Sequence, residues 1–294
     1  MTKKNLTFWA CDYSDKTGEG NLARKFIKEN FKNKKYQIKT LSSKNFFSYK
    51  YIIPFIGVLN CWKYFIKGHN VGYINYLPLW NFLIFLLLPP KTILGPITGG
   101  AIYNKSNNLN YIIRQFCFPI FYKITEIIIH LRSTEKIVFS TDLLKKYLFK
   151  RTIENSDFNF VLKNFKFKKK RKYKNIDFLI YYRIYNNKSL LLNNNFIKNL
   201  VKLNFKICIV GDRLNINGVI NYGYLTKKKI AALQSRSKYS LCSSENIYSL
   251  FIIECITNHV KILINKHHMK KVNFFKKFFI TLNTSKIDLK KLNL

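Results

Sequence analysis

Short apolar runs alternate with polar and glycine-containing stretches along the whole chain. An apolar run bounded by small or charged residues is typical of a buried strand, and a three-to-four-residue apolar period is typical of a helix. The first half predicts strands at residues 6–10, 36–40, 71–75, 92–94 and 136–139, and helices ending at 30 and covering 79–88, 109–132 (kinked or broken at Pro119) and 143–149. The second half predicts strands at 176–181, 206–210, 239–242 and 260–264, and helices at 189–203, at 226–234 and after 243.

This alternation predicts an α/β fold, because strand–helix–strand units join by right-handed crossovers into parallel sheets. Six cations occupy the eight positions 165–172, a composition that suits a solvated connector. We therefore expect two Rossmann-like domains whose parallel sheets face an interdomain cleft. Their predicted bounds are 1–160 and 176–294, with a basic linker at 161–175 and a basic tail at the C-terminus.

Charge is the most unusual feature of the composition. The 294 residues include 52 Lys and Arg but only 14 Asp and Glu, a formal net charge of +38, while 48% of residues are hydrophobic. Such a chain can form a packed core and is not disordered overall. Phosphorylated substrates, anionic membranes and nucleic acids all suit the charge, although evenly spread lysines are also typical of a solvated surface. No nucleic-acid-reading motif is present, so nucleic acid is not an expected partner.

The cysteines and the hydrophobic segments indicate in which cell compartment the protein is expected. The six cysteines form no C-x-x-C pair, which favours buried thiols in a reducing compartment and predicts no metal site. The most apolar stretch, 77–90, is interrupted by prolines and is shorter than the roughly 18 to 20 residues of a spanning helix. We expect a cytoplasmic protein that is free or lies at the inner membrane face. Aromatic and basic residues at 46–67 fit either a peripheral, electrostatic contact with anionic lipid or an ordinary pair of core helices.

Candidate chemistry follows two predicted strands of the second half. After the strand that ends at Cys242, Ser243 and Ser244 suit a helix N-cap, and Glu254 lies in the helix that follows. Ligands of open α/β sheets bind at the carboxyl ends of strands, so Glu254 either binds ligand hydroxyls or sits on a solvated helix face. Arg183 and Lys188, five positions apart (188 − 183 = 5), follow the strand at 176–181.

Glycine-rich loops follow two predicted strands of the first half. Gly18 and Gly20 lie between the first strand and its helix, where backbone N–H groups can approach an anion. The loop that starts at Gly95 and includes Thr98 and Gly99 implies a close backbone approach, either to a ligand or to a neighbouring turn.

Residues 176–264 resemble the nucleotide-sugar site of GT-B glycosyltransferases of the retaining group 1 (family 4) type. That family has an Arg and a Lys five apart, and later a Ser-rich strand end followed by Glu, seven residues and Glu. Here Glu254 takes the second Glu, and counting back (254 − 8 = 246) places Asn246, not Glu245, at the first. Ser189 also stands where the family has Gly, and residues 1–150 are similar only in topology.

The resemblance implies a role for each candidate residue. Arg183 and Lys188 would hold the donor diphosphate, Glu245 or Asn246 would contact the sugar, and Glu254 would bind the ribose hydroxyls. Further donor-side residues would be Gly18, Gly20, Gly211, Tyr248 and Ser249, and the acceptor side would include Gly95, Thr98 and Gly99. The chain has no Asp-x-Asp motif, which counts against the metal-dependent transferase fold.

The expected activity is transfer of a sugar from a nucleoside-diphosphate-sugar to a hydroxyl acceptor. By resemblance it would be of the hexosyl type, retaining and metal-independent, with no cofactor beyond the donor, and its acceptor would be a lipid-linked or envelope glycan intermediate. The alternative is a non-catalytic basic protein that keeps the fold and binds nucleic acid or anionic lipid. A specific nucleotide site would survive salt that abolishes diffuse phosphate attraction.

Overall fold

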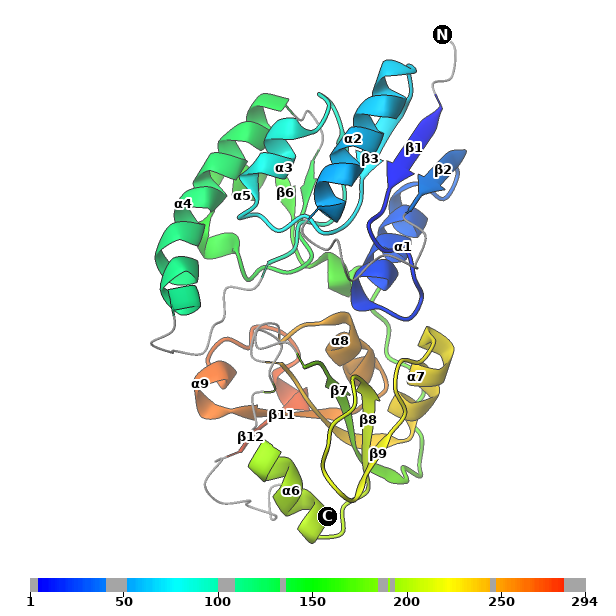
Figure 1. Cartoon of the computed structure of the whole chain (residues 1–294). Coiled ribbons are helices and arrows are strands. Elements are labelled where there is room, and N and C mark those ends of the chain that lie inside the picture. The colour runs from blue at the N-terminus through cyan, green and yellow to red at the C-terminus, as the bar shows by residue number, and fades with distance from the viewer. Residues whose placement is uncertain are drawn as a thin grey trace. The chain divides into compact units, whose positions relative to one another are not determined.

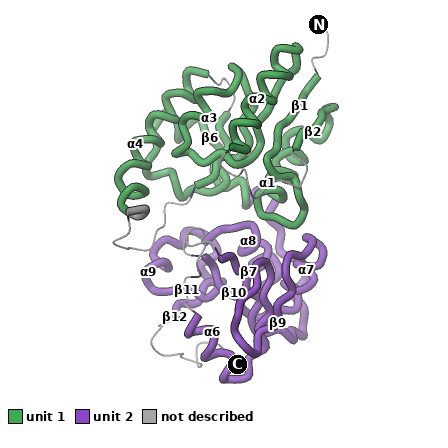
Figure 2. The backbone as a smooth tube through the Cα atoms, in the orientation of Figure 1, with its two compact units in different colours: residues 1–161 green, residues 162–294 purple. Residues whose placement is uncertain are grey.

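The computed structural model describes residues 5–40, 52–99, 109–132, 136–184, 190, 194–243 and 247–282. The chain forms two compact units, Met1–Val161 (unit 1) and Leu162–Leu294 (unit 2), coloured separately in Figure 2. Their elements are labelled in Figure 1. Each unit has its own parallel sheet.

Unit 1 is built on a four-stranded parallel sheet in the order β2-β1-β3-β4. Its strands are β1 (Leu6–Trp9), β2 (Tyr36–Lys39), β3 (Asn70–Tyr73) and β4 (Ile93–Leu94). Beyond β4, single bridges join Pro78 to Thr98 and Ile97 to Phe139. Next to Phe139, β5 (Ile137–Val138) forms a separate two-stranded sheet with β6 (Ser156–Asp157), a strand that the sequence did not predict. The strand order reverses between β1 and β3, which makes that edge the topological switch point of unit 1.

Helices cover both faces of this sheet. They are α1 (Gly18–Asn30), α2 (Ile53–Ile66), α3 (Phe82–Leu87), α4 (Leu109–Arg132) and α5 (Lys150–Glu154). Because side chains alternate along a strand, Phe8 points to one face, 4.8 Å from the Phe31 ring at the end of α1. Trp9 points to the other face, in one core with buried residues of α2, α3 and α4.

Two predictions about unit 1 helices need correction. First, α4 continues through Pro119 as one helix, so of the two alternatives at this proline the break is wrong. Second, the helix predicted at 143–149 is a single 3₁₀ turn, Lys145–Tyr147, and α5 follows it. Leu148 is extended there, and the N–H of Phe149 donates to the Glu126 carboxylate at 2.6 Å instead of continuing a helix.

Unit 2 contains a six-stranded parallel sheet in the order β12-β11-β10-β7-β8-β9. The strands are β7 (Ile176–Tyr182), β8 (Ile207–Gly211), β9 (Val219–Asn221), β10 (Ser237–Leu241), β11 (Lys261–Asn265) and β12 (Phe279–Leu282). Numbered from β7, this is the Rossmann order 3-2-1-4-5-6, with its switch point between β7 and β10. The sequence pattern missed both edge strands, β9 and β12, and β12 falls where a basic tail was expected.

Helices of unit 2 lie on opposite faces of this sheet. They are α6 (Asn194–Lys202), α7 (Lys227–Ser235), α8 (Leu250–Thr257) and the short α9 (Lys266–Met269). Phe196 and Leu200 of α6 share a core with Phe178 and Ile180 of β7. Tyr181 points the other way and stacks on Phe251 of α8, with ring centroids 5.5 Å apart. The face that α8 covers is therefore the face toward which Tyr181 points.

The basic segment expected to be a solvated connector is attached to unit 2. Phe165 lies 4.5 Å from the Phe275 ring, and Phe167 stacks on His259 at 5.3 Å. The N–H of Lys168 also donates to the carbonyl of Thr257 at 2.9 Å. Phe165 and Phe167 thus pack on unit 2, while Lys166 and the lysines at 168–170 stay exposed.

Candidate functional site

The two candidate segments of unit 2 follow neighbouring strands at the switch point. Arg183 comes directly after β7, and Ser243 comes shortly after β10, which pairs with β7 along Ser237–Tyr239. An antiparallel bridge joins Leu190 to Ser243, so the chain that leaves β7 returns to the end of β10. Segments some sixty residues apart in sequence thus meet at the edge where open α/β sheets bind ligands.

Arg183 is held in place by three side chains. Its Nε lies 3.4 Å from Oδ2 of Asp212, its Nη1 donates to the Tyr181 hydroxyl at 3.1 Å, and its guanidinium lies 5.5 Å from the Tyr224 ring centroid. Burial alone would lower the pKa of Arg183, but Tyr181, Tyr224 and Asp212 together raise it. The guanidinium is therefore a charged and oriented group at the end of β7.

Asp212 is a site residue that the sequence analysis missed. One of its oxygens accepts the N–H of Ile184 at 2.9 Å, and the other accepts the Tyr224 hydroxyl. Partial burial would raise the pKa of Asp212, but these hydrogen bonds and the Arg183 charge bring the pKa below its ordinary value. One feature of the sequence does point to Asp212: it directly follows Gly211, the last residue of strand β8, where ligand-binding residues of open α/β sheets lie.

Gly211, expected on the donor side, shapes this cluster. Its φ is +101°, and a Cβ there would lie 2.4 Å from the carbonyl oxygen of Tyr182. Because the glycine has no side chain, the ends of β7 and β8 come close enough for the N–H of Asp212 to donate to Tyr182 at 3.0 Å.

Glu254 lies on α8, the helix that covers the face toward which Arg183 points. Arg183 bonds to Tyr181, Tyr181 stacks on Phe251, and Phe251 precedes Glu254 by about one helical turn. The Glu254 side chain is 25% exposed, and its Oε1 lies 3.1 Å from Nζ of Lys227, the first residue of α7. Lys227 was not among the candidates, because nothing local links it to Glu254.

Two further donor-side candidates, Ser249 and Tyr248, hold the start of α8 in place. Ser249 is the N-cap of α8, later than the expected Ser243 and Ser244, and its Oγ accepts the N–H of Ile252 at 3.3 Å. The Tyr248 ring is buried, and its hydroxyl accepts the N–H groups of Asn273 and Phe274 at 2.9 and 2.8 Å. Its hydroxyl thus anchors the chain before β12. Lys188, Glu245 and Asn246 lie outside the described residues.

The switch point of unit 1 is closed by its own side chains. Asn75, buried after β3, accepts the N–H of Cys11 at 2.9 Å and donates to the carbonyl of Asp12. The Asp12 carboxylate in turn accepts the hydroxyl of Thr17, the N-cap of α1. Gly18 and Gly20 lie in the first turn of α1, not between β1 and the helix as predicted. A Cβ at Gly20 would lie 2.1 Å from the carbonyl oxygen of Ser14, so this glycine lets the preceding loop pack on the helix. At Gly18 a Cβ would meet nothing within 4 Å.

The candidates for the acceptor side lie in extended chain that pairs with its neighbours. A Cβ at Gly95 would lie 1.8 Å from the carbonyl oxygen of Ile74, so the close approach is to the backbone beside β3. Thr98 donates its N–H to Leu77 at 3.1 Å, and a Cβ at Gly99 would lie 2.9 Å from the Leu144 side chain. Of the two alternatives for this loop, contact with a neighbouring segment is therefore the one seen at Gly95.

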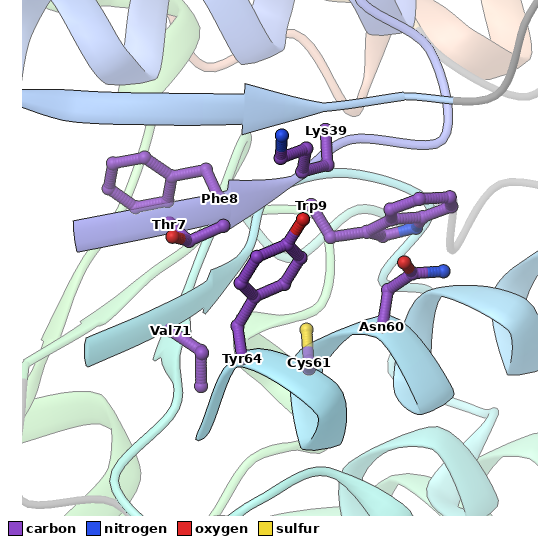
Figure 3. A pocket seen from close by; sticks show the side chains of 8 residues that line it. All are labelled: Thr7, Phe8, Trp9, Lys39, Asn60, Cys61, Tyr64 and Val71. Atoms are coloured by element: carbon purple, nitrogen blue, oxygen red, sulfur yellow. The ribbon is translucent and has the colours of Figure 1, made fainter. Parts of the chain in front are cut away.

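A pocket of unit 1 contains none of the candidate residues (Figure 3). It lies between β1 and α2, is lined by residues including Lys39, Asn60 and Tyr64, and encloses almost no volume, because its roughly 160 Å³ of empty space includes open solvent. Ligand pockets usually measure roughly 300 to 1,000 Å³, so this pocket is too small for a nucleotide-sugar.

Across the described ranges, no three His, Cys, Asp or Glu side chains are grouped to hold a metal ion. Within the same ranges, no helix has the length and apolar character needed to cross a membrane.

Comparison with solved structures identifies the fold. A glycosyltransferase from Rickettsia africae superimposes with a TM-score of 0.54 at 13% sequence identity, covering 100% of this chain and 88% of that chain. The UDP-GlcNAc 2-epimerase of Methanocaldococcus jannaschii, solved with UDP-GlcNAc and UDP, gives 0.53 at 12% identity, with coverages of 99% and 92%. No protein-family model matches the sequence, and no curated protein is detectably similar to it. The predicted α/β GT-B fold of two Rossmann-like domains is confirmed.

Proposed function

We propose that this protein is a glycosyltransferase that moves a sugar from a nucleoside-diphosphate-sugar to a hydroxyl acceptor, with unit 2 binding the donor. The observation that carries the proposal is an oriented Arg183 at the switch point of a Rossmann sheet, beside the helix that bears Glu254. The likeness to the Rickettsia africae glycosyltransferase supports the same assignment.

In this proposal Arg183 stabilises the leaving group. Negative charge accumulates on the nucleoside diphosphate as the glycosidic bond breaks, and a preorganised cation lowers the energy of that transition state most. Asp212, Tyr181 and Tyr224 act as positioning residues, because they hold the guanidinium in one orientation before the donor binds. Lys188 would add a second cation to the diphosphate.

Glu254 would recognise the donor nucleoside. A carboxylate can accept hydrogen bonds from two neighbouring ribose hydroxyls, and charge-assisted bonds of this kind are stronger than neutral ones. Lys227 orients that carboxylate through their 3.1 Å ion pair. Glu245 or Asn246 would contact the sugar.

We further propose retention of configuration, a hexosyl donor, no metal requirement and a lipid-linked or envelope glycan acceptor at the cytoplasmic membrane face.

A second candidate function is epimerisation of a nucleotide-sugar. The Methanocaldococcus jannaschii UDP-GlcNAc 2-epimerase is as similar in structure as the glycosyltransferase, with TM-scores of 0.53 and 0.54. A site that binds a sugar nucleotide through its diphosphate and ribose would serve either reaction. The two functions differ in whether an acceptor is consumed.

A mass-spectrometric screen of nucleotide-sugars, with and without hydroxyl acceptors, tests the proposal. A transferase gives a glycosylated acceptor and a nucleoside diphosphate, both seen by mass. An epimerase isomerises the donor with no acceptor present, and because the epimer has the donor's mass, proton NMR of the sugar is used to detect it. A thermal-shift series with nucleoside diphosphates at about 0.1 M and about 0.5 M salt separates specific from diffuse binding. If no nucleoside diphosphate stabilises the protein at the higher salt, the protein is a non-catalytic basic binder and the proposal is wrong.

A further inference from the structure

Helix α4 exposes a continuous apolar stripe. Ile112, Phe116, Ile120, Ile127 and Leu131 recur at helical spacing on one side, and all five are exposed, with Phe116 at 64% and Leu131 at 80%. Scattered exposed hydrophobic residues are ordinary, but a contiguous apolar surface marks an interaction site.

The stripe is not the side of α4 that packs into unit 1. Tyr122, Thr125 and Ile129 lie on the opposite side of the helix and are buried. The Thr125 hydroxyl donates to the carbonyl of Leu79 at 2.6 Å, which fixes α4 on the core. The helix is therefore apolar on both sides, and only one side is used by the fold.

The apolar surface continues over α3, which packs beside α4, and over α2, which packs beside α3 (Figure 1). Leu83, Leu86 and Leu87 of α3 are exposed, as are Leu59 and Ile66 of α2. Two contacts join the three helices. Phe82 lies 5.6 Å from the Phe121 ring, and the Trp62 indole N–H donates to the carbonyl of Leu87 at 2.7 Å. We call the exposed apolar side chains of these helices the α2–α4 face.

The charges around the α2–α4 face are of one sign. Within the described residues 52–99 and 109–132 the sole acid is Glu126, which is buried and lies 3.3 Å from Lys123. Lys63, Lys67 and Lys91 are exposed around the face. A second copy of the chain would bring these cations together, which is unfavourable. An anionic bilayer instead offers acyl chains to the apolar residues and phosphates to the lysines.

We propose that the α2–α4 face binds the surface of a bilayer that contains anionic phospholipid. From the sequence, residues 46–67 fit either an electrostatic contact with anionic lipid or an ordinary pair of core helices. The structure adds α3 and α4 and a large apolar part. Because hydrophobic contact is not screened by salt, a salt wash alone should not release all of the bound protein. This inference does not depend on the proposed activity.

Vesicle flotation tests the proposal with the full-length protein. Vesicles of phosphatidylcholine alone are compared with vesicles that also contain phosphatidylglycerol, at about 0.1 M and about 0.5 M salt. We expect wild-type protein to float with the anionic vesicles and a fraction to stay bound at the higher salt. Ile120→Glu and Leu131→Glu should each lower the apparent affinity about tenfold or more, since each replaces an exposed apolar side chain that the bilayer would bury with a carboxylate.

Leu203→Glu is the matched control. Leu203 is an exposed leucine of unit 2, and its substitution changes the net charge equally, so binding should stay at the wild-type level. Circular dichroism and melting temperature check that each variant folds. Equal binding of all variants, or no flotation of wild type with anionic vesicles, would overturn the proposal. Light scattering that shows a dimer dissolved by Leu131→Glu would also overturn it, because the face would then bind a second copy.

Discussion

The switch points of the two units have the same kind of topology, but different side chains lie there. In unit 1, Asn75 uses its amide to satisfy Cys11 and Asp12, and Asp12 binds the cap of α1. In unit 2, a charged cluster of Arg183 and Asp212 stands at the equivalent edge. In unit 1 the polar groups at this edge bind one another, whereas in unit 2 the edge carries an oriented guanidinium that can bind an anion.

The difference shows that topology locates an edge without giving it a function. Backbone groups at a sheet end must be satisfied by something, and in unit 1 protein side chains do this. The glycines of unit 1 that suit a ligand loop by sequence make room for backbone instead, as at Gly20 and Gly95. Glycine at Gly211 also makes room for backbone, but there it brings Asp212 to Arg183.

The largest expected effect is at Gly95. Gly95→Ala places a Cβ 1.8 Å from the carbonyl oxygen of Ile74, and backbone must move to relieve the clash. We expect the free energy of unfolding to fall by about 3 kcal/mol or more in urea titrations. Gly18→Ala, where a Cβ meets nothing within 4 Å, is the control and should be near neutral. A stable Gly95→Ala protein would remove the distinction between packing and ligand glycines.

Arg183→Ala should abolish most activity while leaving the fold intact. Loss of a preorganised charge at the leaving group is expected to lower kcat/KM by about 100-fold or more, with turnover affected more than donor affinity. Arg213→Ala, at an exposed arginine directly after Asp212, removes the same charge and should retain activity. Steady-state kinetics of both variants measures the contrast. Equal losses would mean that only net charge matters at this edge.

Glu254→Gln should weaken donor binding. Loss of a charge-assisted hydrogen bond costs about 1.5 to 3 kcal/mol, or roughly 10- to 150-fold in the dissociation constant measured by calorimetry. Glu154→Gln, an exposed carboxylate of unit 1, is the control and should bind normally. Separate Glu245→Ala and Asn246→Ala variants show which neighbour contacts the sugar. Wild-type affinity of Glu254→Gln for every nucleoside diphosphate would refute its assignment.

Asn75→Ala should affect stability alone. It leaves the Cys11 N–H and the Asp12 carbonyl without the partner they have now, which costs about 1 to 3 kcal/mol. Urea unfolding measures that loss, and nucleotide affinity should not change. A drop in donor affinity without a drop in stability would instead make the unit 1 edge part of the binding site.

The smallest effect concerns pH. The folded-state pKa of Asp212 lies below its ordinary value, so its carboxylate stabilises the fold above about pH 3.9 and loses that contribution as pH falls through the folded pKa. Asp212→Asn should be less stable than wild type at neutral pH by less than about 1 kcal/mol, as for an accessible ion pair. Unfolding at several pH values should show the gap closing below about pH 3.9. A constant gap would contradict the ion pair.

The sequence alone determined the local elements and the two segments that matter. Strands such as β7 and β10 and helices such as α1 and α7 follow from apolar periods, because those periods and caps depend on residues within about one turn. The positions of Arg183 and Glu254 after strands of unit 2 could be read in the same way.

Only the tertiary structure decided which distant segments meet. The pairing of β7 with β10, the edge strands β9 and β12, and the contacts of Asp212 with Arg183 and of Lys227 with Glu254 join residues far apart in the chain. No local pattern encodes such contacts, because they depend on the register and order of strands in the sheet. The same holds for α4, whose two sides are both apolar in sequence, and only packing against unit 1 decides which side remains exposed.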